Sequence, residues 1–307
     1  MSAPDSRGPR RRRALAWLVV AAACFGVDTT LSAYALKQLE PADLFVAETV
    51  VGALAVWLAL GRTGLRRPAR LRPHLALGLV EPGLAYLFFD LGLRRTSATS
   101  AGLLGSTDTL LAVTLGVTVL GERLRPLAVG ALLVGTAGTI AVSASGGGGR
   151  GTLIGNGLVL AGALTAGSYY LIARRLPTDD DTLTGTGYQL LASATIAVAY
   201  AAVAWPTTGS GFTSASAPHL AVAALTGVVG VAVPYFLLNR ALPDVPTSTA
   251  ALTQNLIPVF AVVSAIALLG EGFMIVTLLG GSLIVSSLVV IGRTQVARSE
   301  VRCTHRT

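Results

Sequence analysis

Charged residues are scarce in this sequence, and so are the residues that build metal sites and disulfides. Only 12% of the 307 residues are charged, about half the share of a soluble globular domain. The two cysteines, Cys24 and Cys303, lie in such different segments that we expect no disulfide. The three histidines have no metal-ligand spacing, so we expect neither a metal ion nor a cofactor. No stretch is polar enough to form a soluble domain.

Apolar and small residues fill the sequence instead. Hydrophobic residues make up 52% of the chain and 35 residues are glycine, a composition that suits closely packed transmembrane helices. A membrane span needs about 20 mostly apolar residues. We therefore predict an all-α integral membrane protein with ten transmembrane helices, at residues 14–36, 44–60, 74–93, 98–120, 126–144, 153–173, 184–204, 219–240, 247–269 and 272–291.

The basic residues test this division into spans. With the N-terminus in the cytoplasm, 19 of the 23 Lys and Arg residues fall on the inner side, and only Lys37, Arg94, Arg95 and Arg150 fall outside. Such an asymmetry follows the positive-inside rule. We expect a multi-pass protein of the cell membrane with both termini in the cytoplasm. The net charge of +8 is then an orientation signal, and we expect no nucleic-acid partner.

The N-terminus allows another interpretation. Basic residues before an apolar run also resemble a signal peptide, and the stretch ending at Cys24 faintly resembles a lipoprotein site. The run is long, continues past Cys24 and contains Asp28, so a first membrane span is the better prediction.

The two halves of the chain resemble each other. Shifted by 149 residues, 78–122 aligns with 227–271 without a gap, and 11 of 45 positions are identical. Five spans per half is an odd number, so the halves insert in opposite orientations, as in secondary transporters whose site lies between the repeats. The predicted divisions are a basic N-terminus (1–13), a first repeat (14–144), a Gly-rich linker (145–152), a second repeat (153–292) and a cytoplasmic tail (293–307).

Short motifs in the two halves resemble a known family. They are Thr-Ser-Ala-Thr-Ser-Ala at 96–101, Asn-Arg-Ala-Leu at 239–242, Thr-Ser-Thr-Ala-Ala at 247–251, Pro258, and Leu-Gly-Glu at 120–122 and 269–271. In this order the motifs resemble the drug/metabolite transporter superfamily, specifically the EamA-type ten-helix transporters. The resemblance implies transport of small metabolites, often export, without enzymatic activity. This chain has Glu48 where the family usually has an arginine, so the family's usual substrate need not apply.

Five acidic residues lie inside the predicted spans of the first half, namely Asp28, Glu48, Glu81, Asp90 and Asp108. No Lys or Arg lies deep in a span to neutralise them. A charged group at the centre of a membrane helix costs about 2.5–3.5 kcal/mol or more, so these carboxyls are our first candidates for binding a substrate or protons.

Asp108 has the clearest surroundings of the five. It lies near the predicted membrane midplane, on a stripe of small residues formed by Ala101, Gly105, Ala112 and Gly116. Such a stripe lines a cavity or packs against a neighbouring helix, with Asp108 hydrogen-bonded across the contact. Both interpretations remain open at this point.

The other four carboxyls have alternatives of their own. Asp28 either faces a cavity or bonds to its own helix near Thr29 and Ser32. For Glu48, Glu81 and Asp90 the alternatives are solvation at the interface or burial in protonated form. Glu81 and Asp90 are nine residues apart, on opposite sides of a helix, so we expect only one of them to face a given pocket.

The second half offers neutral polar groups. Tyr235 and Asn239 share a helix face, as do Tyr86 and Asp90, and Gln254 and Asn255 lie in the ninth span. These residues are candidates for substrate binding, or they connect helices through hydrogen bonds. Two prolines, Pro234 and Pro258, are expected to kink their helices, which is one way to build a gate.

These observations predict a secondary transporter that exports a small organic metabolite, amine, amino acid or drug by alternating access. The carboxyls would bind a cationic solute or exchange protons with it. An uncoupled facilitator of a neutral or zwitterionic metabolite is the alternative, and a membrane scaffold or sensor is the alternative from another class. The expected partners are the solute, the lipid bilayer and protons. The sequence does not determine whether the working unit is one chain or a homodimer.

Overall fold

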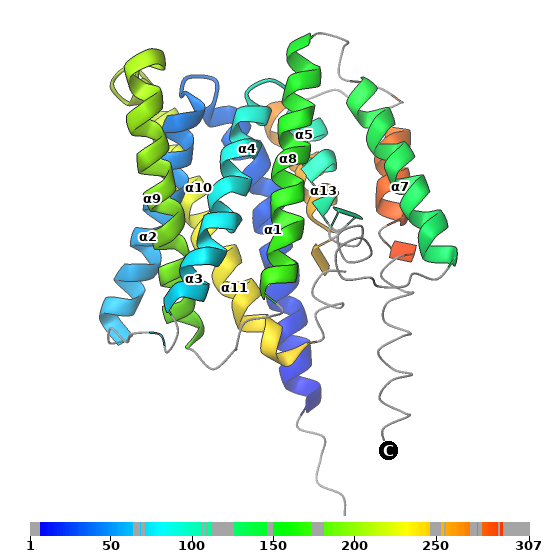
Figure 1. Cartoon of the computed structure of the whole chain (residues 1–307), viewed down its shortest axis with the longest axis horizontal. Coiled ribbons are helices and arrows are strands. Elements are labelled where there is room, and N and C mark those ends of the chain that lie inside the picture. The colour runs from blue at the N-terminus through cyan, green and yellow to red at the C-terminus, as the bar shows by residue number, and fades with distance from the viewer. Residues whose placement is uncertain are drawn as a thin grey trace, which may run out of the picture.

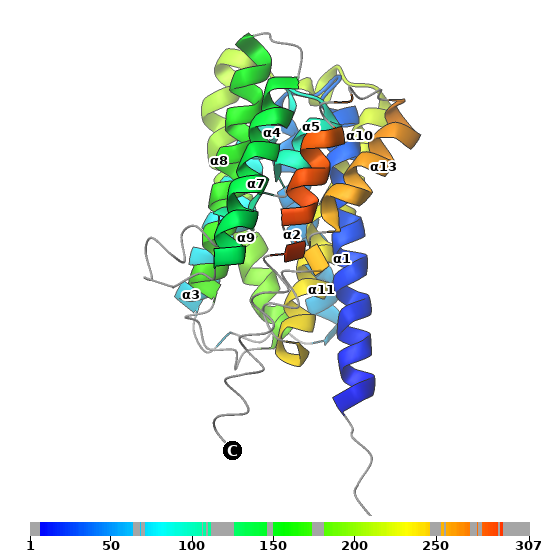
Figure 2. The same cartoon turned by 90° about the vertical axis from the view of Figure 1, so that its right-hand side faces the viewer.

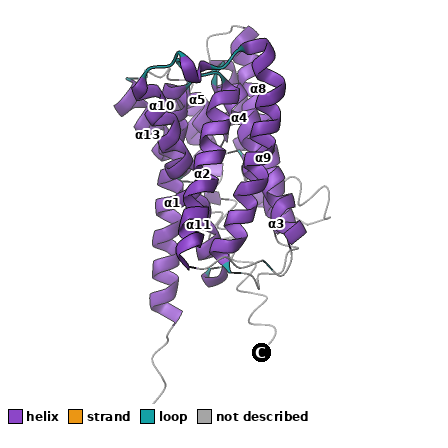
Figure 3. Cartoon of the chain, turned by 90° about the vertical axis from the view of Figure 1, so that its left-hand side faces the viewer, coloured by secondary structure: helices purple, strands orange, loops and turns teal. Residues whose placement is uncertain are grey.

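The computed structural model describes most of the chain and is helical throughout the part it describes. Described are residues 7–63, 68, 71–105, 107–108, 110–111, 126–145, 150–173, 181–245, 253–254, 256–270, 275, 278–287 and 289–290. Within these ranges there are helices and loops and no strand (Figure 3). The helices lie side by side and form one bundle (Figure 1).

The first half, which we define as the described residues up to 145, contains six labelled helices and one short π-helical segment. They are α1 (Arg7–Ala35), α2 (Pro41–Thr63), α3 (Leu71–Gly78), the π segment η1 (Leu79–Leu84), α4 (Ala85–Leu93), α5 (Ala98–Gly105) and α7 (Pro126–Ser145).

The second half, the described residues from 150 onward, follows a similar order. It consists of α8 (Arg150–Ala173), α9 (Thr182–Thr208), a 3₁₀ turn (Gly211–Thr213), α10 (Ala217–Thr226), the π segment η3 (Gly227–Ala232), α11 (Val233–Ala241), a second 3₁₀ turn (Leu242–Asp244), α13 (Ile257–Leu269) and a helical segment at Leu278–Ser287. In Figure 2, α13 lies beside α1, and the two helices pack together.

Five helical stretches among the described residues are long and apolar enough to cross a membrane. They are Arg10–Ala35, Pro41–Arg62, Leu71–Leu93, Thr182–Thr208 and Ala217–Asp244. They coincide with the predicted first, second, third, seventh and eighth spans. Helix α7 coincides with the predicted fifth span, and α8 coincides with the sixth. The described parts of the predicted fourth, ninth and tenth spans are shorter helices. Ten complete spans therefore remain a prediction.

Local sequence explains where several helices begin and end. Helix α2 begins at Pro41, a position where the missing N–H breaks no hydrogen bond. The side chain of Asp181 accepts a hydrogen bond from the N–H of Thr184 at 3.1 Å and so caps α9. Helix α13 ends at Leu269, and Gly270 follows it with a φ of 63°, which glycine adopts at little cost.

The third span is interrupted in the middle. Glu81 has an extended backbone with φ −143° and ψ 119°, between α3 and α4. Pro82 follows it, and the residue before a proline is pushed away from helical geometry. Because the interruption frees a carbonyl, the side-chain N–H of Gln189 donates to the Glu81 carbonyl oxygen at 2.9 Å.

Contacts between the two halves are reciprocal. Helix α1 packs along α11, α8 packs along α4, and α2 packs along α9. Gly78 lies against the backbone of Gln189 in α9, and Gly227, which is 149 residues later, lies against the backbone of Glu48 in α2. A side chain at either glycine would meet that backbone, so both positions bring helices of opposite halves into close contact.

A buried carboxylate ties the α9–α10 loop to the start of α2. One Asp43 oxygen accepts hydrogen bonds from Trp205 Nε1 and Ser210 Oγ, both at 2.9 Å. The other accepts from the N–H of Gly211 at 2.8 Å and from the N–H of Glu40 at 3.0 Å. With both oxygens satisfied, this carboxylate stabilises the fold.

Candidate functional site

A cavity of about 130 Å³ lies between the two halves. Its walls come from α1, η1, α4 and α5 of the first half and from α8, α11 and α13 of the second, together with Asp108 and Gln254. Such a volume holds several water molecules or part of a small organic solute. This cavity is therefore a candidate for the site expected between the halves.

Positions related by the 149-residue shift line this cavity together. Four pairs contribute both members to its wall, namely Tyr86 and Tyr235, Phe89 and Leu238, Gly105 and Gln254, and Asp108 and Ile257. The cavity is therefore built from equivalent segments of the two halves. Its acidic members lie in the first half.

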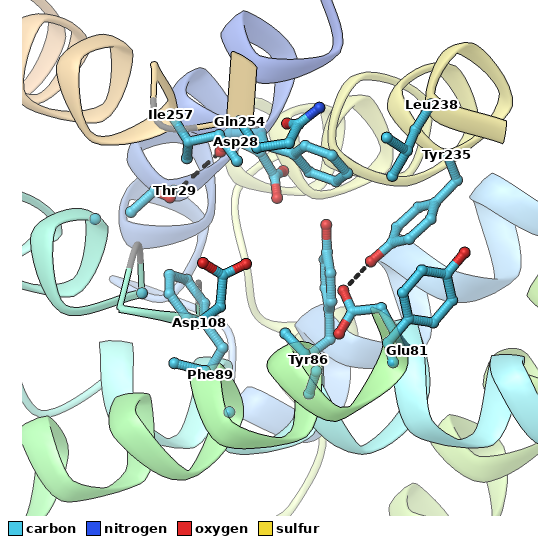
Figure 4. Close-up of a pocket in the computed structure, with 18 residues that line it drawn as sticks. Asp28, Thr29, Glu81, Tyr86, Phe89, Asp108, Tyr235, Leu238, Gln254 and Ile257 are labelled. Carbon is cyan, nitrogen blue, oxygen red and sulfur yellow. Dashed lines mark hydrogen bonds between the residues drawn. The ribbon is translucent and has the colours of Figure 1, made fainter. Parts of the chain in front are cut away.

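Three of the five predicted carboxyls line the cavity, those of Asp28, Glu81 and Asp108. Figure 4 shows the side chains of Asp28 and Asp108 pointing toward the centre from opposite walls. Glu81 is close enough to Asp108 to interact with it electrostatically. Among the described residues, no Lys, Arg or His lines this cavity. The described part of the cavity wall therefore has acidic side chains and no basic one.

The interrupted helix places Glu81 in the cavity wall. One carboxyl oxygen of Glu81 accepts a hydrogen bond from the hydroxyl of Tyr235, drawn as a dashed line in Figure 4. The other oxygen is buried and has no hydrogen-bond partner among the described residues. Glu81 therefore has one oxygen held by the protein and one available for a ligand or a proton.

Tyr86 makes the equivalent contact from the other half. Its hydroxyl donates to the carbonyl oxygen of Gly230 at 2.7 Å. Because Gly230 follows Glu81 by 149 residues, each tyrosine contacts the same position of the opposite half. The side chain of Asp28 packs directly on Gly230, in the space that a side chain at this position would occupy.

Gln254 lies in the cavity wall, and its side-chain amide is buried. The residue is 4% exposed and lines the wall beside Asp28 (Figure 4). Neither its amide nitrogen nor its amide oxygen has a hydrogen-bond partner within the described part of the chain. Buried amides are normally satisfied, so Gln254 is a strong candidate for contact with a solute.

Asn239 has a connecting role in this structure. Its side-chain N–H groups donate to Thr186 Oγ1 at 2.9 Å and to Gln189 Oε1 at 3.2 Å, and its oxygen accepts from the Tyr169 hydroxyl at 3.4 Å. This network joins α8, α9 and α11 and reaches Glu81 through Gln189. Asn239 therefore fits the second interpretation given above, in which a polar side chain connects helices through hydrogen bonds.

A second group of carboxyls lies outside the cavity wall. Glu48 and Asp90 are 0% and 1% exposed and lie next to each other. Asp28 interacts electrostatically with both, and Ser32 Oγ donates to Glu48 Oε1 at 2.6 Å. Interfacial solvation of Glu48 and Asp90 is thus excluded. We call Asp28, Glu48 and Asp90 the acidic cluster.

The acidic cluster has few titratable neighbours. Tyr86 interacts with all three carboxyls and with Glu81, and Cys24 lies near Asp28. Among the described residues, Arg94 and Glu40 form an ion pair, and neither residue belongs to the cluster. In the same ranges, no three His, Cys, Asp or Glu side chains form a metal site. Asp28 is the one residue shared by the cluster and the cavity wall.

A second pocket of about 280 Å³ includes Lys37 and Arg94 in its wall. Both cations are already engaged. Arg94 donates to the carbonyl oxygen of Leu36 and pairs with Glu40 at 3.5 Å, and Lys37 lies over the ring of Tyr34. The central cavity, which has open polar groups, is the better candidate site.

The remaining predicted residues are placed as follows. Pro258 lies in the first turn of α13, where a missing N–H is tolerated. Pro234 lies inside the continuous helical stretch Ala217–Asp244, directly after the π segment η3. Asn255 falls outside the described residues. A break in the helical backbone occurs at Glu81, directly before Pro82. Sequence reasoning did not select this pair as a kink, although a proline inside an apolar run was a usable signal.

Comparisons with known proteins agree with this architecture. The sequence matches the EamA-like transporter family over residues 12–144 and 153–293. A curated relative from Streptantibioticus cattleyicolor, described as "Probable terminal-alkyne amino-acid exporter", is 26% identical over 259 residues, which cover 84% of this chain and 86% of the relative. The match confirms the resemblance inferred from the motifs.

A solved structure described only as "Crystal structure of protein" supports the fold. It aligns with a TM-score of 0.65 and covers 96% of this chain and 98% of its own, at 22% sequence identity. At that identity the likeness concerns the fold alone. With apolar helices long enough to cross a membrane and a family match over both halves, the chain is a multi-pass membrane protein that belongs to the EamA-like transporter family.

Proposed function

We propose that this protein is a secondary transporter that exports a small organic solute bearing an amino group, by alternating access and in exchange for protons. The observation that carries the proposal is the cavity between the halves, with carboxyls of Asp28, Glu81 and Asp108 in its wall and no basic residue among its described lining. A cavity with acidic side chains and no basic one favours the binding of a cationic solute. The family match and the exporter relative support transport and its outward direction.

Alternating access fits the reciprocal contacts. We propose ten spans in two inverted five-helix repeats, with both termini in the cytoplasm and the site between the repeats. The equivalent contacts of Tyr86 with Gly230 and of Tyr235 with Glu81 support this arrangement. In such a protein, equivalent segments of the two halves have different conformations. When each half adopts the conformation of the other, the protein changes from the inward-open to the outward-open state.

The acidic cluster supports the coupling to protons. Glu48 and Asp90 are buried, adjacent and outside the cavity wall, whereas Asp28 belongs to both groups. Three neighbouring carboxyls without a cation share protons. A proton that enters from the outside can thus replace the solute at Asp28, which couples inward proton movement to outward solute movement.

The test is solute flux in vesicles that contain the purified protein. A panel of labelled amines and amino acids is loaded, and efflux is measured with and without an acidic exterior. We expect an acidic exterior to accelerate efflux of at least one compound, and Asp28→Asn and Asp108→Asn to lower it. If both variants transport normally and keep their pH dependence, the role of the carboxyls is refuted.

The same experiment distinguishes the alternatives. Flux that is unchanged when the proton gradient is collapsed indicates a facilitator without coupling. Absence of flux for every compound, in protein that remains folded, supports a scaffold or sensor. The variant Glu40→Gln serves as a control, because Glu40 is a partly exposed carboxylate paired with Arg94 away from the cavity.

A further inference from the structure

We propose that the cavity selects an organic amine cation that lacks a carboxylate, and rejects the zwitterionic amino acid of the same shape. This inference rests on the proposed function and narrows its substrate class. It depends on four features of the cavity: its acidic groups, the interrupted helix at Glu81, its hydrogen-bonding atoms without a partner, and its aromatic wall.

The charge of the wall opposes a carboxylate. Asp28, Glu81 and Asp108 supply three acidic groups, and no described residue of the wall supplies a positive charge. An amino acid would bring its own carboxylate within a few ångströms of these groups, in an environment of low dielectric constant. An amine of the same shape brings only the favourable charge.

The interrupted helix does not provide a carboxylate site either. Substrate carboxylates in transporters often bind at the positive N-terminal end of a broken helix. Here the helix resumes at Pro82, and the residue directly before it is Glu81. An acidic residue therefore directly precedes this helix end, which disfavours the binding of a second carboxylate there.

The open acceptors fit an ammonium group. Three buried oxygens of the wall have no hydrogen-bond partner among the described residues, and they belong to Asp28, Glu81 and Gln254. A primary ammonium group has three N–H donors and no acceptor. The open N–H group of Gln254 remains for a hydroxyl, ether or carbonyl oxygen elsewhere in the solute.

The aromatic wall favours a cation with an apolar body. Five rings line the cavity, those of Phe25, Tyr86, Phe89, Tyr169 and Tyr235. The three tyrosine hydroxyls donate to Gly230, Asn239 and Glu81. With these hydroxyls bonded to the protein, the rings are what the tyrosines offer a solute, and aromatic rings attract cations.

Matched pairs of compounds test this inference without any mutation. Ethanolamine and serine, tyramine and tyrosine, and tryptamine and tryptophan each differ by one carboxylate. Binding of the labelled compounds to the purified full chain is measured by equilibrium dialysis at neutral pH. In the pair that binds best, we expect the amine to bind about tenfold tighter than its amino acid, or more.

One variant tests the role of Gln254 in binding. Gln254→Leu keeps the size of the side chain and removes both hydrogen-bonding groups, and we expect it to weaken the best amine about tenfold. The control Glu40→Gln should bind like the unmodified protein. The inference is overturned if the amino acid of the best pair binds as tightly as its amine, if no amine binds, or if Gln254→Leu binds as well as the original.

Binding and transport can fail separately. Binding of an amine without any flux in vesicles would refute the proposed transport and leave the assignment of the cavity intact. Flux of an amino acid together with the absence of amine binding would refute the assignment and leave the transporter intact.

Discussion

Tyr235 donates a hydrogen bond to the carboxyl group of Glu81 across the boundary between the two halves. The equivalent donor, Tyr86, contacts the equivalent position, Gly230, at 2.7 Å. The two contacts thus have the same place in the fold and different acceptors. One acceptor is an ionisable side chain and the other is a backbone carbonyl, so only the first can respond directly to a change in pH.

This difference predicts unequal effects of the same substitution at the two tyrosines. In Tyr235→Phe, Glu81 loses the hydroxyl that favours its charged form. Loss of a partner by a buried group costs about 1–3 kcal/mol. We expect solute exchange in vesicles to become about tenfold slower at neutral pH, and its pH profile to move toward alkaline pH.

Tyr86→Phe is the matched control for this prediction. It removes one hydroxyl from the same kind of helix position, but the lost acceptor is the carbonyl oxygen of Gly230. We expect a change in rate with a smaller shift of the pH profile than in Tyr235→Phe, because the Tyr86 hydroxyl donates to a backbone carbonyl. Equal shifts in the two variants, or no shift in either, would contradict the role assigned to Glu81.

Substitutions in the acidic cluster should separate coupling from binding. Glu48→Gln and Asp90→Asn remove ionisable groups that do not line the cavity. We expect proton-driven net efflux to fall about tenfold or more, since buried ionisable groups in membranes serve proton transfer. Exchange of labelled for unlabelled solute should persist, because the solute does not contact these residues.

Glu81→Gln provides the comparison, since it changes the cavity wall itself and should reduce both net efflux and exchange. Glu40→Gln should change neither. A loss of exchange in Glu48→Gln that matches its loss of net efflux would place Glu48 in the binding site and refute the separation.

Acidification should weaken solute binding in the unmodified protein. Protons and a cationic solute compete for the oxygens of Asp28, Glu81 and Asp108, so binding tightens as pH rises and weakens as pH falls. Equilibrium dialysis of the best-binding amine over a pH series measures the effect. The dependence should be shallower in Asp28→Asn; a profile unchanged in this variant would exclude competition at Asp28.

Much of this site could be predicted from the sequence because its signals are local. Carboxyls in apolar runs identified Asp28, Glu81 and Asp108, and the 149-residue shift paired Tyr86 with Tyr235. The same shift pairs Phe89 with Leu238 and Gly105 with Gln254, and these residues line the cavity as well. An internal repeat therefore carries information about a site between its copies.

Other parts of the site depend on tertiary packing. Gln189 is distant in sequence from Glu81, and its bond to the freed carbonyl arises only because α9 packs against η1. Burial of Glu48 and Asp90 likewise follows from contacts of α2 and α4 with each other and with the second half. Hydropathy places these residues along a span, but it does not determine which neighbours surround them.

Asp43 should control stability without affecting transport chemistry. Asp43→Ala leaves the partly buried donors of Trp205, Ser210 and Gly211 without their acceptor. We expect a loss of roughly 2–4 kcal/mol in stability, seen as a lower unfolding midpoint in detergent. Asp43→Asn keeps one acceptor oxygen and should be intermediate. Amine binding at low temperature should be unchanged, and a loss of affinity in Asp43→Asn would place this residue in the binding site.

Filling the cavity should block binding while the fold remains intact. Ala166 of α8 lines the cavity, and Ala166→Leu extends an apolar side chain into space that the solute would occupy. We expect amine binding to fall about tenfold or more, with an unfolding midpoint equal to or above that of the unmodified protein, because a filled cavity adds apolar contacts.

The matched control is Ala137→Leu at an exposed position of α7. Because the two variants introduce the same side chain, a difference between them reports the location of the solute. If both bind normally, the solute site lies elsewhere in the chain.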